Sequence, residues 1–241
     1  MRYAVLSDVH ANLEALRAVL ADAADRSDAV FCLGDVVGYG ADPAACIDLV
    51  GERCQAVVGG NHERAVAGQL DLDWFNPHAR AAAEWTRERL DTDAHAWMDA
   101  LPLVREVEDA TLVHASPAGP DEWEYLISAE DGFAAFGAFA TRVCFVGHSH
   151  IPRVWSSGSW GRDWEPHPSE IAIEAGCRYI VNVGSVGQPR DRDPRAAYVL
   201  WDTEQRRIAV RRVLYDVGAA RAKIVAAGLP RFLADRLGGG R

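Results

Sequence analysis

The chain has 241 residues, 49% of them hydrophobic, and it carries a formal net charge of −10 at pH 7. This length and apolar content support one sizeable core, so we expect a single domain over residues 1–241. The acidic balance disfavours a nucleic-acid partner, which normally requires a basic face. No apolar run approaches the roughly 18 residues that span a bilayer, so we expect no membrane segment. The N-terminus shows no targeting segment, which favours a cytoplasmic protein.

The five cysteines are scattered along the chain without C-x-x-C spacing. An odd and unpatterned set indicates buried free thiols, and it does not indicate a disulfide framework. We therefore leave the cysteines out of the candidate metal ligands. They are Cys32, Cys46, Cys54, Cys144 and Cys177.

The first 60 residues alternate between strand and helix patterns. Apolar runs at 3–6, 29–33 and 55–58 predict buried strands. The apolar stripe of an amphipathic helix lies between the first two runs, with Asn12 as its cap. This stripe consists of Leu13, Leu16, Val19 and Leu20. A second helix is predicted after Pro43, so the β-α-β-α-β order indicates helices packed on a sheet with a parallel portion.

The segment of about 70–102 is rich in alanine and contains the helix-start signal Asn76-Pro77. We expect it to form a small helical insertion over one end of the sheet. Strand patterns then return at 111–114, 143–147, 179–183, 196–201 and 208–213. The last three are closely spaced with turn residues between them, which predicts antiparallel strands.

The end of the chain gives three further expectations. The Arg-rich stretch 206–212 alternates with apolar residues, which predicts an exposed edge strand protected by charge. Residues 229–237 predict a terminal helix, and the tail 238–241 is expected to fray. Three tryptophans of a Gly/Ser-containing stretch would shape a substrate mouth, a dimer contact or a packed loop, and the sequence does not decide which. They are Trp155, Trp160 and Trp164.

Polar side chains of the metal-binding type gather directly after the apolar strand runs. Five of the eight histidines lie there, with two aspartates and an asparagine. In chain order the blocks are Asp8-Val9-His10, Gly34-Asp35, Gly60-Asn61-His62-Glu63, Val113-His114 and Gly147-His148-Ser149-His150. Each block alone is typical of a cap, a turn or a buried histidine. Because the carboxyl ends of strands line the crevice of open α/β sheets, the five blocks together predict one site.

The donor types in these blocks are imidazole, carboxylate and carboxamide, without thiolate. Such donors suit Mn, Fe or Zn, with Co and Ni also compatible, better than Ca or Mg. A pair of ions about 3.5–4 Å apart needs about seven protein ligands and leaves open positions for water and phosphate. The sequence therefore predicts two divalent transition-metal ions, with a hydroxide between them that attacks phosphorus in line. The seven candidate ligands are Asp8, His10, Asp35, Asn61, His114, His148 and His150.

With these blocks in order, the sequence resembles the calcineurin-like metallophosphoesterase superfamily. The pattern of that superfamily is D-x-H, G-D, G-N-H-[DE], H and G-H-x-H. The later stretch Asn182 to Arg190 looks like the N-x-G-S loop of its small bacterial and archaeal members. The resemblance implies an α/β fold, a four-layer α/β/β/α sandwich of two mixed sheets.

The resemblance also implies how the site residues divide the work. Asp35 would bridge two ions, and His62 would face the leaving-group oxygen as a catalytic acid. One ion would be held by Asp8, His10, Asp35 and His150. The other would be held by Asp35, Asn61, His114 and His148.

Two departures from the pattern concern the substrate. Serine/threonine protein phosphatases of this superfamily carry an arginine in their G-D-x-x-x-R block and another directly before G-N-H-E. Tyr39 and Gly59 stand at those places here, so two phosphate-binding guanidinium groups are missing. Arg64 and Arg190 are candidate replacements that would bind the phosphate of the substrate.

The sequence thus predicts a two-metal-dependent hydrolase that acts on a small phosphomonoester or a nucleotide-type phosphodiester. Cleavage of a dinucleoside polyphosphate and a protein phosphatase activity stay as alternatives, and the acidic charge argues against a nuclease. A non-catalytic, metal-dependent scaffold or sensor is the alternative of another class. His62 favours the enzyme, because a scaffold needs no leaving-group acid. The physiological substrate, the native metal and a homo-oligomeric state stay open.

Overall fold

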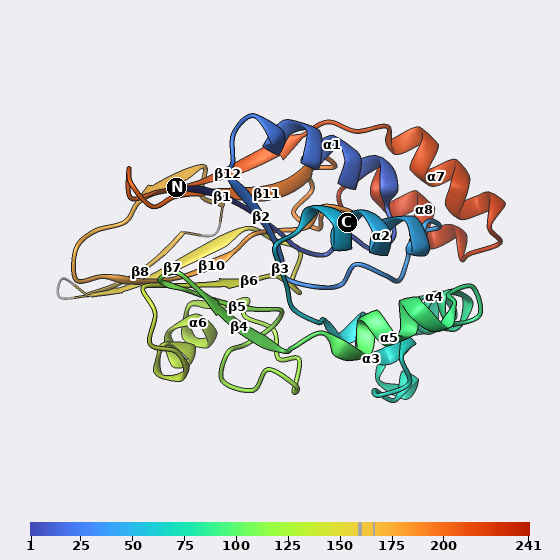
Figure 1. Ribbon diagram of the computed structural model, residues 1–241, viewed down its shortest axis with the longest axis horizontal. Helices are drawn as coiled ribbons and strands as arrows, with labels where there is room; N and C mark the ends of the chain where they lie inside the picture. The colour runs from blue at the N-terminus through green and yellow to red at the C-terminus, as the bar shows by residue number, and fades with distance from the viewer. Residues whose placement is uncertain (159–160, 166) are drawn as a thin grey trace.

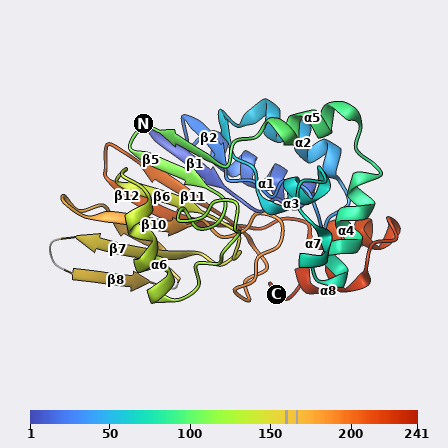
Figure 2. The same ribbon diagram turned by 90° about the horizontal axis from the view of Figure 1, so that it is seen from below.

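The computed structural model describes residues 1–158, 161–165 and 167–241. Over these residues the chain forms two mixed sheets that lie face to face, with helices on both outer sides (Figures 1 and 2). This confirms the four-layer α/β/β/α sandwich of two mixed sheets. No helix in the described part of the chain has the length and apolar content that a membrane crossing requires.

The first sheet has the strand order β3-β2-β1-β11-β12-β9. Its strands are β3 (Ala56–Val57), β2 (Ala29–Cys32), β1 (Arg2–Leu6), β11 (Ala196–Asp202), β12 (Arg207–Val213) and β9 (Glu170–Ala172). β1, β2 and β3 run parallel, because a helix returns the chain after each of the first two strands. β11, β12 and β9 continue the sheet with antiparallel pairs.

The second sheet has the strand order β4-β5-β6-β10-β7-β8. Its strands are β4 (Val104–Val107), β5 (Ala110–Val113), β6 (Val143–Val146), β10 (Arg178–Asn182), β7 (Arg153–Gly158) and β8 (Gly161–Glu165). Its centre, β5-β6-β10, is parallel. The expected antiparallel pairing is confirmed for β11 and β12. It is wrong for β10, because β10 lies in this sheet and β11 and β12 lie in the other. Short spacing along the chain does not distinguish a hairpin from a crossover between sheets.

The core lies in layers on both sides of each sheet. In β1, Tyr3 and Val5 point into the apolar layer between the two sheets, where they meet side chains such as Phe145. Ala4 and Leu6 point the other way, into the layer beneath the helices. Alternate residues of a strand face opposite sides, so a strand buried on both faces appears as one continuous apolar run in the sequence.

Helices cover the outer faces of both sheets, with one group on the first sheet (Figure 1). The first group is α1 (Leu13–Ala24), α2 (Pro43–Arg53), α7 (Val217–Ala226) and α8 (Arg231–Leu237). On the second sheet lies α6 (Ala129–Ala135), followed by the 3₁₀ turn η2 (Phe136–Ala138). The predicted cap of α1 is confirmed, since the Asn12 side chain accepts a hydrogen bond from the N–H of Ala15. The sequence patterns did not predict α6 and α7.

The segment 70–102 forms helices beyond one end of the sheets, on the right of Figure 1. It follows α3 (Asn61–Val66) and contains the 3₁₀ turn η1 (Leu72–Trp74), α4 (Pro77–Arg87) and α5 (Thr92–Ala100). Asn76 caps α4 by accepting hydrogen bonds from the N–H groups of His78 and Ala79.

The Arg-rich strand β12 does not form an edge, contrary to the prediction. It lies between β11 and β9, and β9 covers its first part from Arg207 to Ala209. The later arginines of the strand are bound to acidic side chains, with Arg211 beside Asp22 and Arg212 beside Asp191. Alternating charge therefore reflects ion pairs across the surface of the sheet here.

The C-terminal tail packs against the protein, and the expectation that it frays is wrong. The N–H of Arg192 donates to the carbonyl of Gly240 over 2.8 Å. Trp155 is fully buried in the core beneath α6, and its indole N–H donates to the carbonyl of Ser128, so it is a packing residue. Trp160 lies outside the described residues. All five cysteines are free thiols and four are buried, while Cys54 is partly exposed.

Candidate metal centre

The strand-end blocks meet at one rim of the structure, where the carboxyl ends of both sheets lie. The seven candidate ligands and His62 follow β1, β2, β3, β5 and β6. The structure buries all of them: Asp8, His10, Asp35, Asn61, His62, His114, His148 and His150. Buried polar groups at this density need hydrogen bonds or a bound cation to compensate for lost hydration.

Much of the backbone at this rim adopts the left-handed conformation, which costs a non-glycine residue about 1 kcal/mol or more. Five of the candidate ligands are concerned, with φ between +49° and +65°: Asp8, His10, Asp35, His148 and His150. Backbone hydrogen bonds hold this geometry, for example from the Asp8 N–H to the Gly34 carbonyl and from the His10 N–H to the Asp35 carbonyl. Strain concentrated at one site is typical of functional residues whose side chains must point in a set direction.

Two glycines of the blocks allow close approach to the carboxylates. A Cβ atom at Gly60 would collide with the side chain of Asp35. A Cβ atom at Gly147 would lie 2.6 Å from Oδ2 of Asp8. The G-N-H and G-H-x-H blocks therefore need glycine for space, since no side chain fits there.

Four imidazoles have one ring nitrogen held by a backbone carbonyl. The nitrogen–oxygen distances are 3.1 Å from His10 Nδ1 to Val37, 2.8 Å from His114 Nδ1 to Leu33, 2.9 Å from His148 Nε2 to Trp123 and 2.6 Å from His150 Nδ1 to Gln188. A carbonyl only accepts, so each of these nitrogens carries the hydrogen. In a neutral imidazole the other nitrogen then offers a lone pair, which is how metal-binding histidines are normally oriented.

The four inner nitrogens face one another in two pairs. His10 Nε2 lies 3.1 Å from His150 Nε2, and His114 Nε2 lies 3.2 Å from His148 Nδ1. Two lone pairs at this distance repel each other unless a cation or a proton lies between them. This geometry fits a pair of metal positions, one at each histidine pair.

The two aspartates join the histidine pairs. Asp35 Oδ2 lies 3.7 Å from His10 Nε2 and 3.3 Å from His114 Nε2, so it reaches one nitrogen of each pair. Asp8 Oδ1 lies 3.2 Å from His150 Nε2. Oδ1 of Asp8 and Oδ1 of Asn61 have no hydrogen-bond partner among the described residues, although both are buried. Orphaned buried oxygens beside inward lone pairs are what a metal site without its ions leaves behind.

Burial and charge set the protonation of these groups. Burial lowers the pKa of His148 to about 4 and that of His150 to about 3, so both are neutral at neutral pH and can bind a cation. Burial also acts to lower the pKa of His114, but the carboxylate of Asp35 outweighs it and raises the value to about 9. A proton therefore occupies the position beside His114 when no metal is bound, and metal and proton compete there.

His62 differs from the other four imidazoles. Its Nε2 lies 4.0 Å from Asp35 Oδ2, so proximity alone would group it with His10 and Asp35 as a third cluster. No backbone carbonyl holds its ring, and its Nδ1 has no hydrogen-bond partner among the described residues. The ring is packed between Tyr39 and Phe75, at centroid distances of 4.5 and 5.0 Å. His62 is thus placed by ring packing, with its Nε2 toward Asp35 and its Nδ1 buried against Gly38.

Glu63 is a site residue that the sequence reasoning did not assign. Its carboxylate is fully buried and accepts four backbone hydrogen bonds. Oε2 accepts from the N–H groups of Asp35 and Gly60, and Oε1 accepts from those of Val36 and Val37. The acid at the end of the G-N-H-[DE] block was the available signal, and its work is to hold the turn that carries Asp35.

The N-x-G-S stretch supports the site from behind. The Asn182 side chain donates to the Gly147 carbonyl and to Ser149 Oγ, within the block that carries His148 and His150. The Ser185 hydroxyl donates to the carbonyl of Asp8 over 2.9 Å. This loop ties the residues after β1 to those after β6 and so fixes the spacing between the two sheets at the site.

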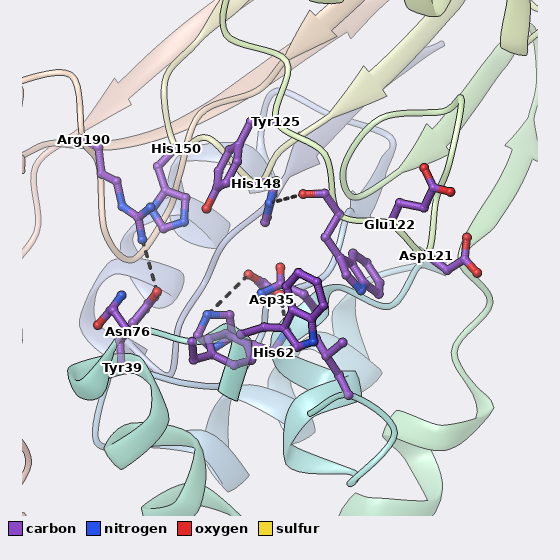
Figure 3. A pocket seen from close by; sticks show the side chains of 15 residues that line it. Asp35, Tyr39, His62, Asn76, Asp121, Glu122, Tyr125, His148, His150 and Arg190 are labelled. Carbon is purple, nitrogen blue, oxygen red and sulfur yellow. Dashed lines mark hydrogen bonds and ion pairs between the residues drawn. The ribbon is translucent and has the colours of Figure 1, made fainter. Parts of the chain in front are cut away.

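A cavity of about 540 Å³ opens onto this centre (Figure 3). Four candidate ligands and His62 contribute to its lining: Asp35, Asn61, His62, His148 and His150. Its walls carry five aromatic side chains from separate loops, and only Tyr39 stands at a motif position. These are Tyr39, Trp74, Phe75, Trp123 and Tyr125.

The two arginine candidates lie in different places. Arg190 lines the cavity beside His150, and its guanidinium donates to Gln188 Oε1 over 2.8 Å and to the Tyr39 hydroxyl over 3.4 Å. Arg64 is not among the cavity residues, since its guanidinium binds the Leu101 carbonyl and the Gln69 side chain. The structure therefore brings Arg190 to the candidate centre but turns Arg64 away, toward the helices of 70–102.

This fold, with a buried set of imidazole and carboxylate donors where the two sheets end, defines a metallophosphoesterase. Comparison with protein families agrees, because the model of the calcineurin-like phosphoesterase superfamily domain matches residues 1–206. The chain belongs to that superfamily, whose members depend on metal ions.

Relatives of similar length occur in archaea and bacteria. An uncharacterised protein from Methanocaldococcus jannaschii is 40% identical over 245 residues, which cover 99% of this chain and 98% of the relative. The crystal structure of a metallophosphoesterase from Sphaerobacter thermophilus has 40% identity and a TM-score of 0.87, over 100% of this chain and 99% of the other. A hypothetical protein from Pyrococcus horikoshii, at 20% identity, has a TM-score of 0.81 over 100% and 98% of the chains and shows the shared fold.

Proposed function

We propose that this protein is a two-metal-dependent phosphoesterase that hydrolyses a small phosphomonoester or a nucleotide-type phosphodiester. The proposal rests on the two histidine pairs, His10 with His150 and His114 with His148. In each of them two ring nitrogens face one another with their lone pairs directed inward. Asp35 Oδ2 lies within 4 Å of a nitrogen from each pair, so one carboxylate can serve both positions.

The proposed ligand sets are those that the resemblance implies, and the two histidine pairs support them. One ion is assigned to Asp8, His10, Asp35 and His150, and the other to Asp35, Asn61, His114 and His148. These nitrogen and oxygen donors without thiolate suit Mn, Fe or Zn. Two ions held in this way would supply an activated water molecule and would neutralise charge on the phosphoryl oxygens.

The chain contributes further groups around the reacting phosphate. Arg190 is the cavity's guanidinium, and it can donate charge-assisted hydrogen bonds to a phosphoryl oxygen. His62 lines the same cavity and is proposed to donate a proton to the ester oxygen as the leaving group departs. Burial lowers the pKa of His62, and the carboxylate of Asp35 acts against it. The anionic phosphate of a bound substrate would raise this pKa further and favour the imidazolium that the proton transfer needs.

The size of the cavity favours a small substrate. A volume of about 540 Å³ is in the range of small-molecule sites, and Tyr39 fills the place where protein phosphatases carry an arginine. Both observations disfavour a phosphorylated protein as the substrate. A purely structural metal site would not require a cavity that opens onto its ligands.

The proposal is tested by stripping the purified protein with a chelator and reloading it with Mn, Fe or Zn. We expect two ions per chain by elemental analysis, and hydrolysis of p-nitrophenyl phosphate, its bis-ester or a dinucleoside polyphosphate. The variant Asp35→Asn should lower activity and metal occupancy together. Asp93→Asn, at an exposed carboxylate of α5, is its matched control. At most one bound ion after saturation, or loaded protein that turns over none of the esters, would overturn the proposal.

A further inference from the structure

The aromatic side chains of the cavity form two walls from loops far apart in the sequence. Trp74 and Phe75 come from the turn before α4, and Trp123 and Tyr125 come from the loop between β5 and α6. Trp74 is 84% exposed, although indole rings are normally well buried. An exposed indole at the mouth of a cavity is available to stack on a ligand.

Residues of both aromatic walls contact histidines of the candidate centre. The Tyr125 ring stacks on His148, with centroids 4.0 Å apart and an interplanar angle of 20°. The Trp123 carbonyl accepts the hydrogen bond from His148 Nε2, and Trp123 adopts a left-handed backbone with φ of +56°. The Phe75 ring meets His62 edge-on. These contacts hold the Tyr125 and Phe75 rings in place before a ligand arrives, which lowers the entropy cost of binding.

Charge is divided across the cavity. Arg190 lies on one side, and Asp121 and Glu122 lie on the opposite side with the candidate centre between them (Figure 3). Neither of these two carboxylates has an ion-pair partner in the described part of the chain. An ionised carboxylate only accepts hydrogen bonds, so that side repels a second phosphate and favours a neutral group with N–H donors.

We propose that the substrate is a nucleoside phosphate whose base stacks against the aromatic walls and turns N–H donors toward Asp121 and Glu122. This rests on the proposed phosphoesterase function and adds the identity of the esterified group. The phosphate lies at the candidate centre beside Arg190, and the base fills the outer cavity. A trimethylammonium group is also attracted to aromatic rings and carboxylates, but it is far smaller than a cavity of about 540 Å³.

The first test compares adenosine 5′-monophosphate with ribose 5-phosphate on the Mn-loaded, full-length protein. The two substrates share the sugar and the phosphate, and they differ only in the base. We expect kcat/KM to be about 5- to 100-fold higher for the nucleotide, the range that stacking of one base provides. Trp74→Ala is expected to remove most of this preference. Phe232→Ala, at a half-exposed ring stacked on His78 outside the cavity, is the matched control and keeps the preference.

The second test measures binding of adenosine, which has no phosphate, by quenching of tryptophan fluorescence. Saturable binding that Trp74→Ala weakens about tenfold supports the base site, even if no ester is hydrolysed and the phosphoesterase proposal fails. Equal kcat/KM for the nucleotide and ribose 5-phosphate would overturn the base site and leave the phosphoesterase intact. A preference for phosphocholine over the nucleotide would overturn it in favour of a quaternary ammonium group.

Discussion

Replacing Glu63 by glutamine should destabilise the protein and loosen the metal centre together. The substitution keeps the shape of the side chain but exchanges one carboxylate oxygen for an NH₂ group. Each oxygen accepts two backbone N–H groups, with distances of 2.7 and 2.8 Å at Oε2 and 2.7 and 3.1 Å at Oε1. Whichever way the amide turns, two buried N–H donors then face another donor.

The magnitude follows from these lost acceptors. A buried donor left unsatisfied costs about 1–3 kcal/mol, so two of them lower the free energy of unfolding by about 2–6 kcal/mol. For a chain of this length that corresponds to a fall in Tm of roughly 5–20 °C. Because one affected pair includes the N–H of Asp35, we also expect metal affinity to drop about 10- to 100-fold, as for other residues that orient metal ligands.

Urea unfolding of the metal-free protein measures the first effect, and metal titration measures the second. Glu52→Gln is the matched control, since Glu52 is exposed on α2 and has no ion-pair partner among the described residues. An unfolding free energy of Glu63→Gln within about 0.5 kcal/mol of the wild type, the usual range for surface substitutions, would refute the assigned role.

Four further substitutions test the centre, one of them a control. Asp35→Asn removes the charge shared by both histidine pairs, so activity and metal occupancy should fall together and added metal should no longer raise Tm; full retained activity would contradict the assignment. His62→Ala should keep both ions but lose about 10²–10⁴ in rate on alkyl or sugar phosphates, and distinctly less on p-nitrophenyl phosphate, whose leaving group needs no proton; equal losses would argue against a leaving-group acid. Arg190→Met should lower kcat/KM roughly 10- to 100-fold, because charge-assisted hydrogen bonds contribute about 1.5–3 kcal/mol, whereas Arg64→Met should leave kcat/KM unchanged if only Arg190 contacts substrate.

The sequence determined which polar groups meet at the candidate centre. Each block is short and directly follows an apolar run, so the block and the strand end that carries it are set by neighbouring residues. Parallel strands bring their carboxyl ends to one edge, so the sequence alone predicts that Asp8, Asp35 and His114 lie at one rim. The sandwich itself followed from the resemblance that these blocks carry.

Only the tertiary structure decided how the site is held and what surrounds it. The carbonyls that fix the imidazoles belong to distant residues, since His10 and Val37 are 27 positions apart and His114 and Leu33 are 81 apart. The position of Arg64 also depends on a distant residue. It directly follows the G-N-H-E block in the sequence, but its guanidinium binds the Leu101 carbonyl and so lies away from the cavity.

The aromatic walls and the placement of β10 and β12 share this cause. Trp74 and Trp123 lie in loops with no periodic pattern, so their approach depends on how the elements between them pack. The partner of a strand likewise depends on which apolar faces are still uncovered when the sheets assemble. Local patterns record the preferences of a segment, whereas these features arise from contacts between segments, and a single sequence contains no direct signal for them.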